Sequence, residues 1–170
     1  MPDEELQKKL HRSKISAGLL MYRFRNRQLQ LFLVHPGGPF WARKDEGAWS
    51  IPKGELEENE PPLEAAIREF EEEIGVKPQG NFLDLGSIRQ RGGKTVYAWA
   101  FAGDYDEAKP IKSNTFTLEF PPHSGKIQEF PEIDKAAFFE VEEAKQKINS
   151  AQTEFIDRLQ KMLDQDSKVG

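Results

Sequence analysis

Residues 54–76 read GELEENEPPLEAAIREFEEEIGV, a loop that passes through two prolines into a helical run. The prolines at 61–62 suit a first helical turn, where backbone N–H groups have no intrahelical partner, and Asn59 or Glu60 can cap it. Gly75 supplies a C-terminal stop. The apolar residues that recur at helical spacing are Leu63, Ala66, Ile67 and Phe70. The stretch therefore predicts an amphipathic helix between the prolines and Gly75.

Four glutamates crowd the end of this helix: Glu69, Glu71, Glu72 and Glu73. Residues three and four apart share a helix face, so Glu69, Glu72 and Glu73 are expected to face the same way. Like charges at these spacings destabilise a helix by roughly 0.2–0.5 kcal/mol per pair, and the carbonyl end of the helix dipole adds to the repulsion. A bound divalent cation reverses both effects, and Mg²⁺ prefers oxygen ligands. A solvated acidic face is the alternative, and the acids alone fit both.

The whole stretch resembles the Nudix signature, G-x5-E-x7-R-E-U-x-E-E-x-G-U, where U is a bulky apolar residue. The nine matching positions over these 23 residues are Gly54, Glu60, Arg68, Glu69, Phe70, Glu72, Glu73, Gly75 and Val76. The resemblance implies a Nudix hydrolase, an enzyme that depends on Mg²⁺ or Mn²⁺ and cleaves a diphosphate bond in a nucleoside diphosphate linked to another group. It covers about residues 14–163 and implies an α/β fold, the α/β/α sandwich with a mixed sheet between helices.

The resemblance also implies roles for individual residues. The metal ligands that it implies are Glu69, Glu72, Glu73 and the carbonyl of Gly54. Arg68 is expected to orient these acids rather than to touch substrate. Glu60 is expected to start the helix or to form a salt bridge. Glu132 is an outlying acid that is expected to complete a metal shell or to act as the base.

Features outside the signature are similar to the asymmetric diadenosine tetraphosphate hydrolases. They are residues 49–54 (WSIPKG), residues 94–99 (KTVYAW), and Glu132 shortly before two phenylalanines. The likeness implies that Lys94 contacts polyphosphate and that Tyr97 stacks on a base, which is worth about 1–3 kcal/mol. A half-buried strand tyrosine is the alternative for Tyr97.

The loop before the signature is rich in cationic and aromatic residues. Lys53 lies beside the expected metal site, where a fixed ammonium can neutralise a phosphate. For Trp41, Arg43 and Lys44, substrate contacts and ordinary loop positions both fit. Trp49 is expected to be buried at the end of the sheet.

These features predict asymmetric cleavage of diadenosine tetraphosphate to ATP and AMP. A general nucleoside triphosphate pyrophosphohydrolase is the alternative within the family. A module that only binds nucleotides or RNA ends is the alternative of another class. The intact acids argue against it, since binding alone does not require several carboxylates that ligate metal.

The composition narrows the partners. A chain of 170 residues and 19.5 kDa is large enough for one domain with a core. Its net charge of −5 argues against broad binding to nucleic acids or anionic membranes. The chain contains no cysteine, which excludes disulfides and thiol catalysis. With no secretory pattern at the N-terminus, the expectation is a cytoplasmic enzyme with a small nucleotide as substrate.

The hydrophobic pattern predicts the remaining elements. They are strands at 16–24 and 28–35, a hairpin of 82–90 and 94–101, a short strand at 115–120, a last strand at 136–141 and a terminal helix at 142–164. The second strand is expected to be buried on both faces. The predicted organisation is a tail or short helix at 1–13, one domain at 14–165 and a tail at 166–170. The insert at 109–127 and the loop at 36–47 look distinctive.

Overall fold

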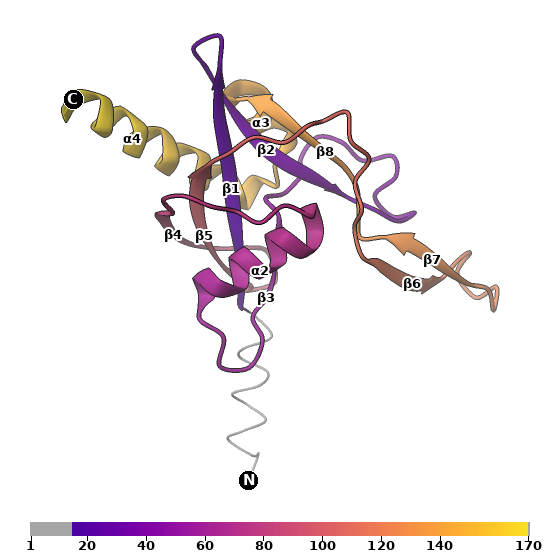
Figure 1. Ribbon diagram of the computed structural model, residues 1–170. Coiled ribbons are helices and arrows are strands. Elements are labelled where there is room, and N and C mark those ends of the chain that lie inside the picture. The colour runs from indigo at the N-terminus through magenta and orange to yellow at the C-terminus, as the bar shows by residue number, and fades with distance from the viewer. Residues whose placement is uncertain (1–14, 170) are drawn as a thin grey trace.

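The computed structural model of the chain describes residues 15–169, with a mixed β-sheet between helices (Figure 1). The sheet contains β1 (Ile15–Arg25), β2 (Gln28–Pro36), β3 (Lys53–Glu55), β4 (Leu83–Arg89), β5 (Thr95–Ala102) and β8 (Ile133–Glu140). A separate hairpin contains β6 (Thr115–Glu119) and β7 (Ile127–Pro131). The helical elements are α2 (Pro62–Ile74), α3 (Val141–Lys147), the 3-10 turn η1 (Ser150–Gln152) and α4 (Thr153–Val169). The predicted α/β/α sandwich is confirmed. The segment predicted at 1–13 lies outside the described residues, and α4 continues past the boundary expected at 165.

The strand order is β4-β5-β1-β2-β8, with β3 as a side branch on β1. Strand β1 runs parallel to β5 and antiparallel to β2. Its outer half pairs with β2 at Tyr22–Leu31, whereas its inner half pairs with β3 at Gly18–Lys53. The strands β1 and β2 therefore separate toward the bottom of Figure 1, and the chain that leads into α2 fills the split between them.

Two apolar clusters pack on the two faces of the sheet. Alternate residues of β1 and β2 contribute to opposite clusters, because successive side chains of a strand point to opposite faces. The buried residues on the α2 face include Ala17, Leu19, Met21, Phe32, Val34, Ala66, Phe70 and Phe138. Those on the α4 face include Leu20, Leu31, Leu33, Ile51, Ile148, Phe155 and Leu159. Strand β2 is thus buried on both faces, as its sequence predicts.

The terminal helix is broken, which corrects the prediction of one helix over 142–164. Helix α3 ends at Lys147, and Ile148 takes an extended conformation with ψ 148°. Ile148 is buried and forms a β-bridge with Trp49, and the Asn149 N–H donates to the Trp49 carbonyl at 2.7 Å. The Asn149 side chain then accepts from the Ala151 N–H and starts η1. Tertiary pairing and this local hydrogen bond together outcompete the helix.

Two strand predictions are also corrected. Strand β8 begins at Ile133, three residues earlier than expected, because its first residue pairs with Pro36 across a register shift. Strand β7 was not predicted, and it pairs with β6 to make a hairpin that projects from the sheet (Figure 1). Among residues 15–169, no helix combines the length and apolar character needed to cross a bilayer.

A buried amide links the last helical elements to the segment before β3. The Gln152 side chain is fully buried, and its Oε1 accepts from the Ile51 N–H at 3.0 Å. Its Nε2 donates to Ser50 Oγ at 3.0 Å and to Gln90 Oε1 at 2.9 Å. Gln152 therefore fixes the chain two residues before Lys53.

We expect Gln152→Ala to lower the free energy of unfolding by about 1–3 kcal/mol, because the Ile51 N–H is left buried without a partner. Urea denaturation of the purified variant measures this change. Gln146→Ala, at an exposed position of α3, is the matched control. Equal stabilities for the two variants would contradict the role given to Gln152.

Candidate active site

Helix α2 carries its acids at the end that is least favourable for them. Pro61 is the N-cap residue and makes no side-chain cap, so Asn59 and Glu60 do not cap the helix as expected. At the other end Gly75 is left-handed, with φ 82°, and its N–H donates to the Glu71 carbonyl at 2.8 Å. The last turn contains no basic residue. Carboxylates there face the negative end of the helix dipole with no countercharge from that turn.

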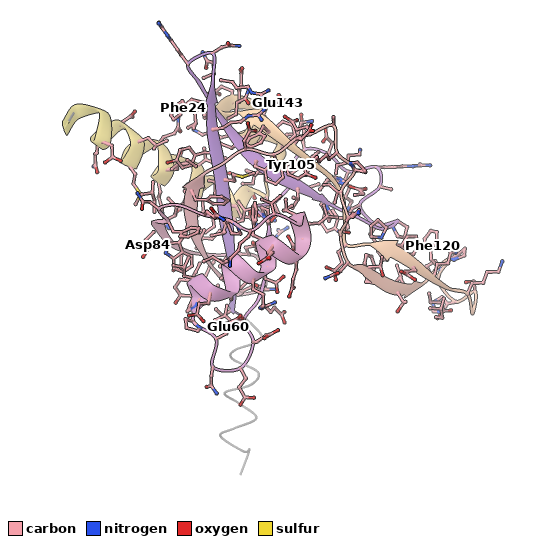
Figure 2. All side chains as sticks on the ribbon, in the orientation of Figure 1. Phe24, Glu60, Asp84, Tyr105, Phe120 and Glu143 are labelled. Carbon is pink, nitrogen blue, oxygen red and sulfur yellow. The ribbon has the colours of Figure 1, made fainter. Side chains whose placement is uncertain are left out.

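Arg68 supplies the countercharge from one turn earlier. Its Nε and Nη2 donate to the two carboxylate oxygens of Glu60 at 2.8 and 2.9 Å, a bidentate pair beside the loop below α2 (Figure 2). Its Nη1 donates to Glu69 Oε1 at 3.0 Å and to both carboxylate oxygens of Glu72 at 3.3 Å. The hydrogen bond to Glu60, with the other acids, raises the pKa of Arg68, and the same bond lowers the pKa of Glu60. Glu60 is thus a salt-bridge residue.

Gly54 allows the loop to lie directly on one of these acids. It sits in β3 opposite Ala17 of β1. A Cβ added at Gly54 would lie 2.0 Å from the carboxylate carbon of Glu69 and would displace this carboxylate from its observed position. Burial raises the pKa of Glu69, while the Arg68 charge opposes that shift. The glycine of the signature therefore lets the backbone of β3 lie against the Glu69 carboxylate.

Glu73 is the most strongly perturbed acid of the helix. Its Oε2 is buried and has no hydrogen-bond partner among the described residues. Burial, together with the nearby charge of Glu69, raises the pKa of Glu73 to about 8, although Lys53 acts in the opposite direction. Burial, and then the Lys94 charge, lowers the pKa of Lys53. A buried carboxylate oxygen without a partner is costly unless a ligand satisfies it.

The acids fit a divalent cation by their chemistry. Mg²⁺ and Mn²⁺ take carboxylate and carbonyl oxygens, and Glu73 Oε2 is such a donor without a partner. Within residues 15–169, no three acidic or histidine side chains converge on one point in the present rotamers. Glu69 and Glu72 turn toward Arg68 instead. Both side chains would have to turn away from Arg68 to share an ion with Glu73.

A cleft of about 170 Å³ opens beside Glu73. Its other charged lining residues are Lys53 and Glu132, and Ser50 and Ile133 contribute to its walls. Glu132 comes from the bend between β7 and β8, where its N–H donates to the Asn114 carbonyl at 2.8 Å. The charge of Glu132 adds to the rise in the pKa of Glu73. The cleft thus brings together acids that are far apart in the sequence, with one lysine between them.

The other predicted substrate residues lie in two places. Lys94 pairs with Glu55 at 3.3 Å, next to the signature loop. Tyr97 lies on β5 opposite Ala17 and packs, half-buried, against the cluster beneath α2. Neither Lys94 nor Tyr97 is among the described residues that line the cleft. Tyr97 thus packs against the α2 face of the sheet, one strand away from Gly54.

The aromatic loop residues lie on the other side of the cleft. Trp41 is 41% exposed, the Lys44 ammonium lies 5.1 Å from its ring centre, and Arg43 is exposed. His35 is buried and holds this loop, because its Nε2 contacts the Lys44 carbonyl at 2.6 Å. Trp49 is buried, as predicted, with its indole N–H on Asp45 at 2.8 Å.

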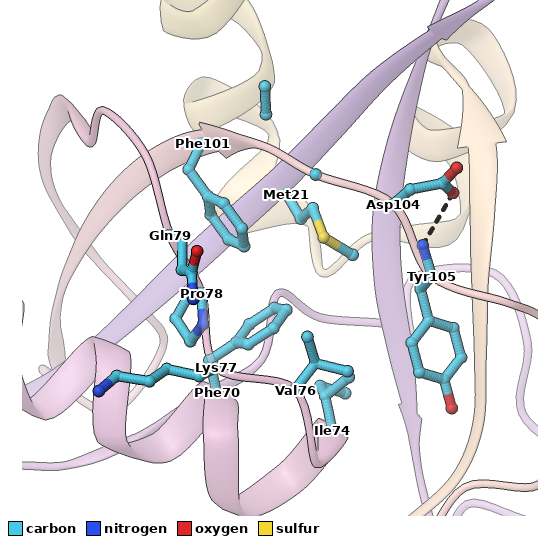
Figure 3. A pocket seen from close by; sticks show the side chains of 12 residues that line it. Met21, Phe70, Ile74, Val76, Lys77, Pro78, Gln79, Phe101, Asp104 and Tyr105 are labelled. Carbon is cyan, nitrogen blue, oxygen red and sulfur yellow. Dashed lines mark hydrogen bonds between the residues drawn. The ribbon is translucent and has the colours of Figure 1, made fainter.

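Another pocket lies at the C-terminal end of α2 and differs from the acid cleft in chemistry (Figure 3). It measures about 190 Å³ and is walled mainly by apolar side chains such as Phe70, Ile74 and Phe101. Its one acid, Asp104, is already paired with Arg23 at 2.6 Å. This pocket offers no set of carboxylates and is not the candidate metal site.

Several residues around the cleft were not found from the sequence. Gln152 and Asp134 act through hydrogen bonds, to Ile51 and to His35, that join segments far apart in the chain. Nothing local in the sequence marks such pairs. Phe40 and Phe116 line a pocket next to the cleft. The sequence contains a weak indication of this role for Phe116 alone. Phe116 alternates with threonines in the predicted strand at 115–120, so one face of that strand had to be covered.

Fold and site together define a protein that presents helix-borne carboxylates at a cleft between diverging strands. A family model for the NUDIX domain matches residues 12–159, and the chain belongs to this family.

Curated relatives match over shorter segments. An RNA pyrophosphohydrolase from Halorhodospira halophila is 51% identical over 55 residues, which are 32% of this chain and 30% of that protein. One from Hahella chejuensis is 39% identical over 51 residues, which are 29% of this chain and 32% of that protein. The aligned segments thus span about a third of the length of these relatives.

Solved structures match over nearly the whole fold. A C. elegans Ap4A hydrolase in a binary complex has a TM-score of 0.63 at 18% identity, covering 88% of this chain and 98% of that chain. The NUDIX domain of Shewanella oneidensis NrtR, complexed with ADP ribose, has a TM-score of 0.60 at 14% identity, covering 88% and 87%. At these identities the likeness establishes the fold.

We expect the stability of the metal-free protein to fall as the pH rises from about 4.5 to about 8. The folded pKa of Glu73 lies above its ordinary value of 4.5, so the folded state binds the proton more tightly than the unfolded chain does over this range. Glu73→Gln removes the titratable carboxyl group and should therefore flatten the dependence of stability on pH. Its gain in melting temperature over the wild type should be largest at high pH. Melting curves in a chelating buffer measure it.

Glu71→Gln, an exposed neighbour on the same helix, is the control and should keep the wild-type slope. A Glu73→Gln protein whose melting temperature follows pH as the wild type does would show that Glu73 is not protonated in the folded state.

Proposed function

We propose that this chain hydrolyses a diphosphate bond in a nucleoside polyphosphate, using Mg²⁺ or Mn²⁺ bound by Glu69, Glu72, Glu73 and the Gly54 carbonyl. The observation that carries the proposal is the buried, unpartnered Glu73 Oε2. Glu73 lines the cleft together with Lys53, and it belongs to the complete signature of the family. A cation bound there would neutralise phosphate charge and lower the pKa of an attacking water.

The chain's own residues would then have separate tasks. Lys53 lines the cleft beside Glu73, so its ammonium would bind a phosphate oxygen and stabilise the charge that moves onto the leaving group. Arg68 would hold Glu69 and Glu72 in place through the contacts described above, as a positioning residue. Water adds to phosphorus while the bridging P–O bond breaks, and the leaving phosphate keeps the bonding electrons.

The proton of that water needs an acceptor at the cleft. Glu132 is exposed there, and its backbone is fixed by hydrogen bonds on both sides, from Gly37 and to Asn114. Glu132 and Glu73 both line the cleft. We assign Glu132 to the role of base, with completion of the metal shell as the alternative.

The substrate we propose is diadenosine tetraphosphate, cleaved asymmetrically to ATP and AMP. The fold is similar to that of the C. elegans Ap4A hydrolase. A tetraphosphate carries about four negative charges and needs several cationic partners. Lys53 and Lys94 are close enough for their charges to interact, and Lys44 and Arg43 lie exposed on the loop beyond the cleft.

Two other activities are the alternatives, and a specific observation favours one of them. The short matches to RNA pyrophosphohydrolases favour removal of pyrophosphate from RNA 5′ ends. The net charge of −5 argues against long nucleic-acid contacts. Hydrolysis of nucleoside triphosphates needs only the acid cleft and one nucleoside site. A module that binds without hydrolysis would not need the carboxylates at the end of α2.

A substrate panel separates these activities. Diadenosine tetraphosphate, ATP, ADP-ribose and a short 5′-triphosphorylated RNA are each incubated with Mg²⁺, and the products are separated by chromatography. We expect the highest kcat/KM on diadenosine tetraphosphate, with ATP and AMP as products. A preference of more than about tenfold, or ~1.4 kcal/mol, for any other member overturns the substrate. No turnover of any member overturns the hydrolase proposal.

We expect Glu72→Gln to lower kcat by roughly 10²–10³-fold, because it removes a charge from the ligand set while the fold remains. Glu72 is partly exposed, so the metal-free variant should melt at or slightly above the wild-type temperature. Glu71→Gln lies on the same turn outside the ligand set and should keep wild-type turnover. Near-normal turnover in Glu72→Gln would contradict the proposed ligand set.

A further inference from the structure

A pocket adjoins the acid cleft on the side away from α2. It measures about 280 Å³ and lies between the loop after β2 and the β6–β7 hairpin. Pro36 and Glu132 line both the pocket and the acid cleft, so the two spaces meet at these residues. The remaining walls are mostly aromatic and apolar, with Phe40 and Trp41 from the loop and Phe116 and Leu118 from β6.

The pocket is built by a close approach of loop and hairpin. The Gly37 N–H donates to the Glu132 carbonyl at 2.9 Å, and a Cβ at Gly37 would lie 2.0 Å from the Pro131 carbonyl oxygen. Gly38 has φ 94°, and a Cβ there would lie 2.7 Å from the ring of Phe116. Both glycines are therefore required for this approach, and the pocket is a fixed part of the fold.

The hairpin turns one face toward this space. Along β6, half-buried Phe116 and Leu118 alternate with exposed neighbours, as expected for a strand with one covered side. Phe116 pairs across the hairpin with Phe130, with ring centres 6.0 Å apart, and Phe130 in turn contacts Phe120, whose place on the hairpin Figure 2 shows. Trp41 and Phe40 opposite are 41% and 65% exposed. Aromatic surface is thus presented from both walls.

The charges on the hairpin limit what the pocket can take. Residues 115–131 contain one lysine and two glutamates, which gives no cationic groove for a nucleic-acid backbone. A flat, uncharged aromatic group suits such walls, because every nucleobase has a face that stacks on aromatic side chains. The adjoining cleft already provides acids and Lys53 for the phosphate chain.

We propose that the pocket between the loop after β2 and the β6–β7 hairpin is a nucleobase subsite, with Trp41 and Phe116 as its stacking walls. The inference rests on the proposed function, since the base is that of the nucleotide whose phosphates occupy the acid cleft. It places base recognition on the hairpin side of the cleft, away from Tyr97 on β5. The hairpin is then the element that selects substrates with an aromatic group beyond the phosphates.

Binding measurements with two matched probes test the subsite. One probe is an ATP analogue whose bridging oxygens are methylene groups, so that it cannot be cleaved there. The other is the same methylene-bridged triphosphate chain without its nucleoside. Calorimetry with Mg²⁺ gives both affinities for the wild type, Trp41→Ala, Trp41→Phe and Phe116→Ala. Phe24→Ala, an exposed aromatic at the far end of β1, and Ile127→Ala, an exposed hairpin residue, are the controls.

We expect Trp41→Ala and Phe116→Ala each to weaken the analogue by about tenfold, within the roughly 5- to 150-fold range for aromatic stacking. Trp41→Phe should retain most of the affinity, and the controls all of it. Binding of the bare chain should be unchanged throughout. If Phe116→Ala unfolds the hairpin, the exposed Trp41 decides the question.

The proposal is overturned if the analogue binds Trp41→Ala as tightly as wild type, or if the bare chain weakens in parallel. It is also overturned if the wild type binds both probes equally. Hydrolysis assays on the same proteins keep the two proposals apart. A wild type that binds the base but cleaves nothing removes the hydrolase and leaves the subsite, and the reverse result removes only the subsite.

Discussion

The short pairing of β3 with the inner half of β1 is the constraint on which the site depends. Three residues replace β2 as the partner of β1, and this replacement holds the chain before α2 inside the sheet. The approach is so close that a Cβ on Gly54 would overlap the Glu69 carboxylate in its observed position. Gln152 fixes the preceding residues from the opposite face. The divergence of β1 and β2, the position of the β3 segment and the position of Glu69 therefore depend on one another.

The acids of α2 are stable in this position because Arg68 is an internal countercharge. Glu60 anchors the guanidinium in two places, and the remaining donors reach Glu69 and Glu72. Glu73 lies outside this network, and its carboxyl keeps the proton to a higher pH instead. A cation that entered would compete with Arg68 for two carboxylates and with a proton for the third. Arg68 and this proton thus offset part of the repulsion among the helix acids.

Sequence information is sufficient where the structure depends on local spacing. Helix α2, its stop at Gly75 and the strands β1, β2, β4 and β5 follow from periodicity and turn residues within short windows. The break at Ile148 follows instead from pairing with Trp49, about a hundred residues earlier, which no local pattern reveals. The same holds for β7, whose exposed residues lack an apolar alternation. In the candidate site the helix acids and Glu132 were found by motif, whereas Phe116 required the fold, since its partners come from another loop.

The β6–β7 hairpin bonds to the rest of the protein at its base and forms its own two-stranded sheet. Because the hairpin is a separate sheet, we expect substitutions near its tip to leave the register of the central sheet and the packing of α2 unchanged. The acid helix would carry out hydrolysis, whereas the hairpin would contact the base. The sequence of either part can consequently change in evolution without a change in the other. Grafting hairpins of other sequence between residues 114 and 132 offers a route to enzymes with new preferences that keep the same acid helix.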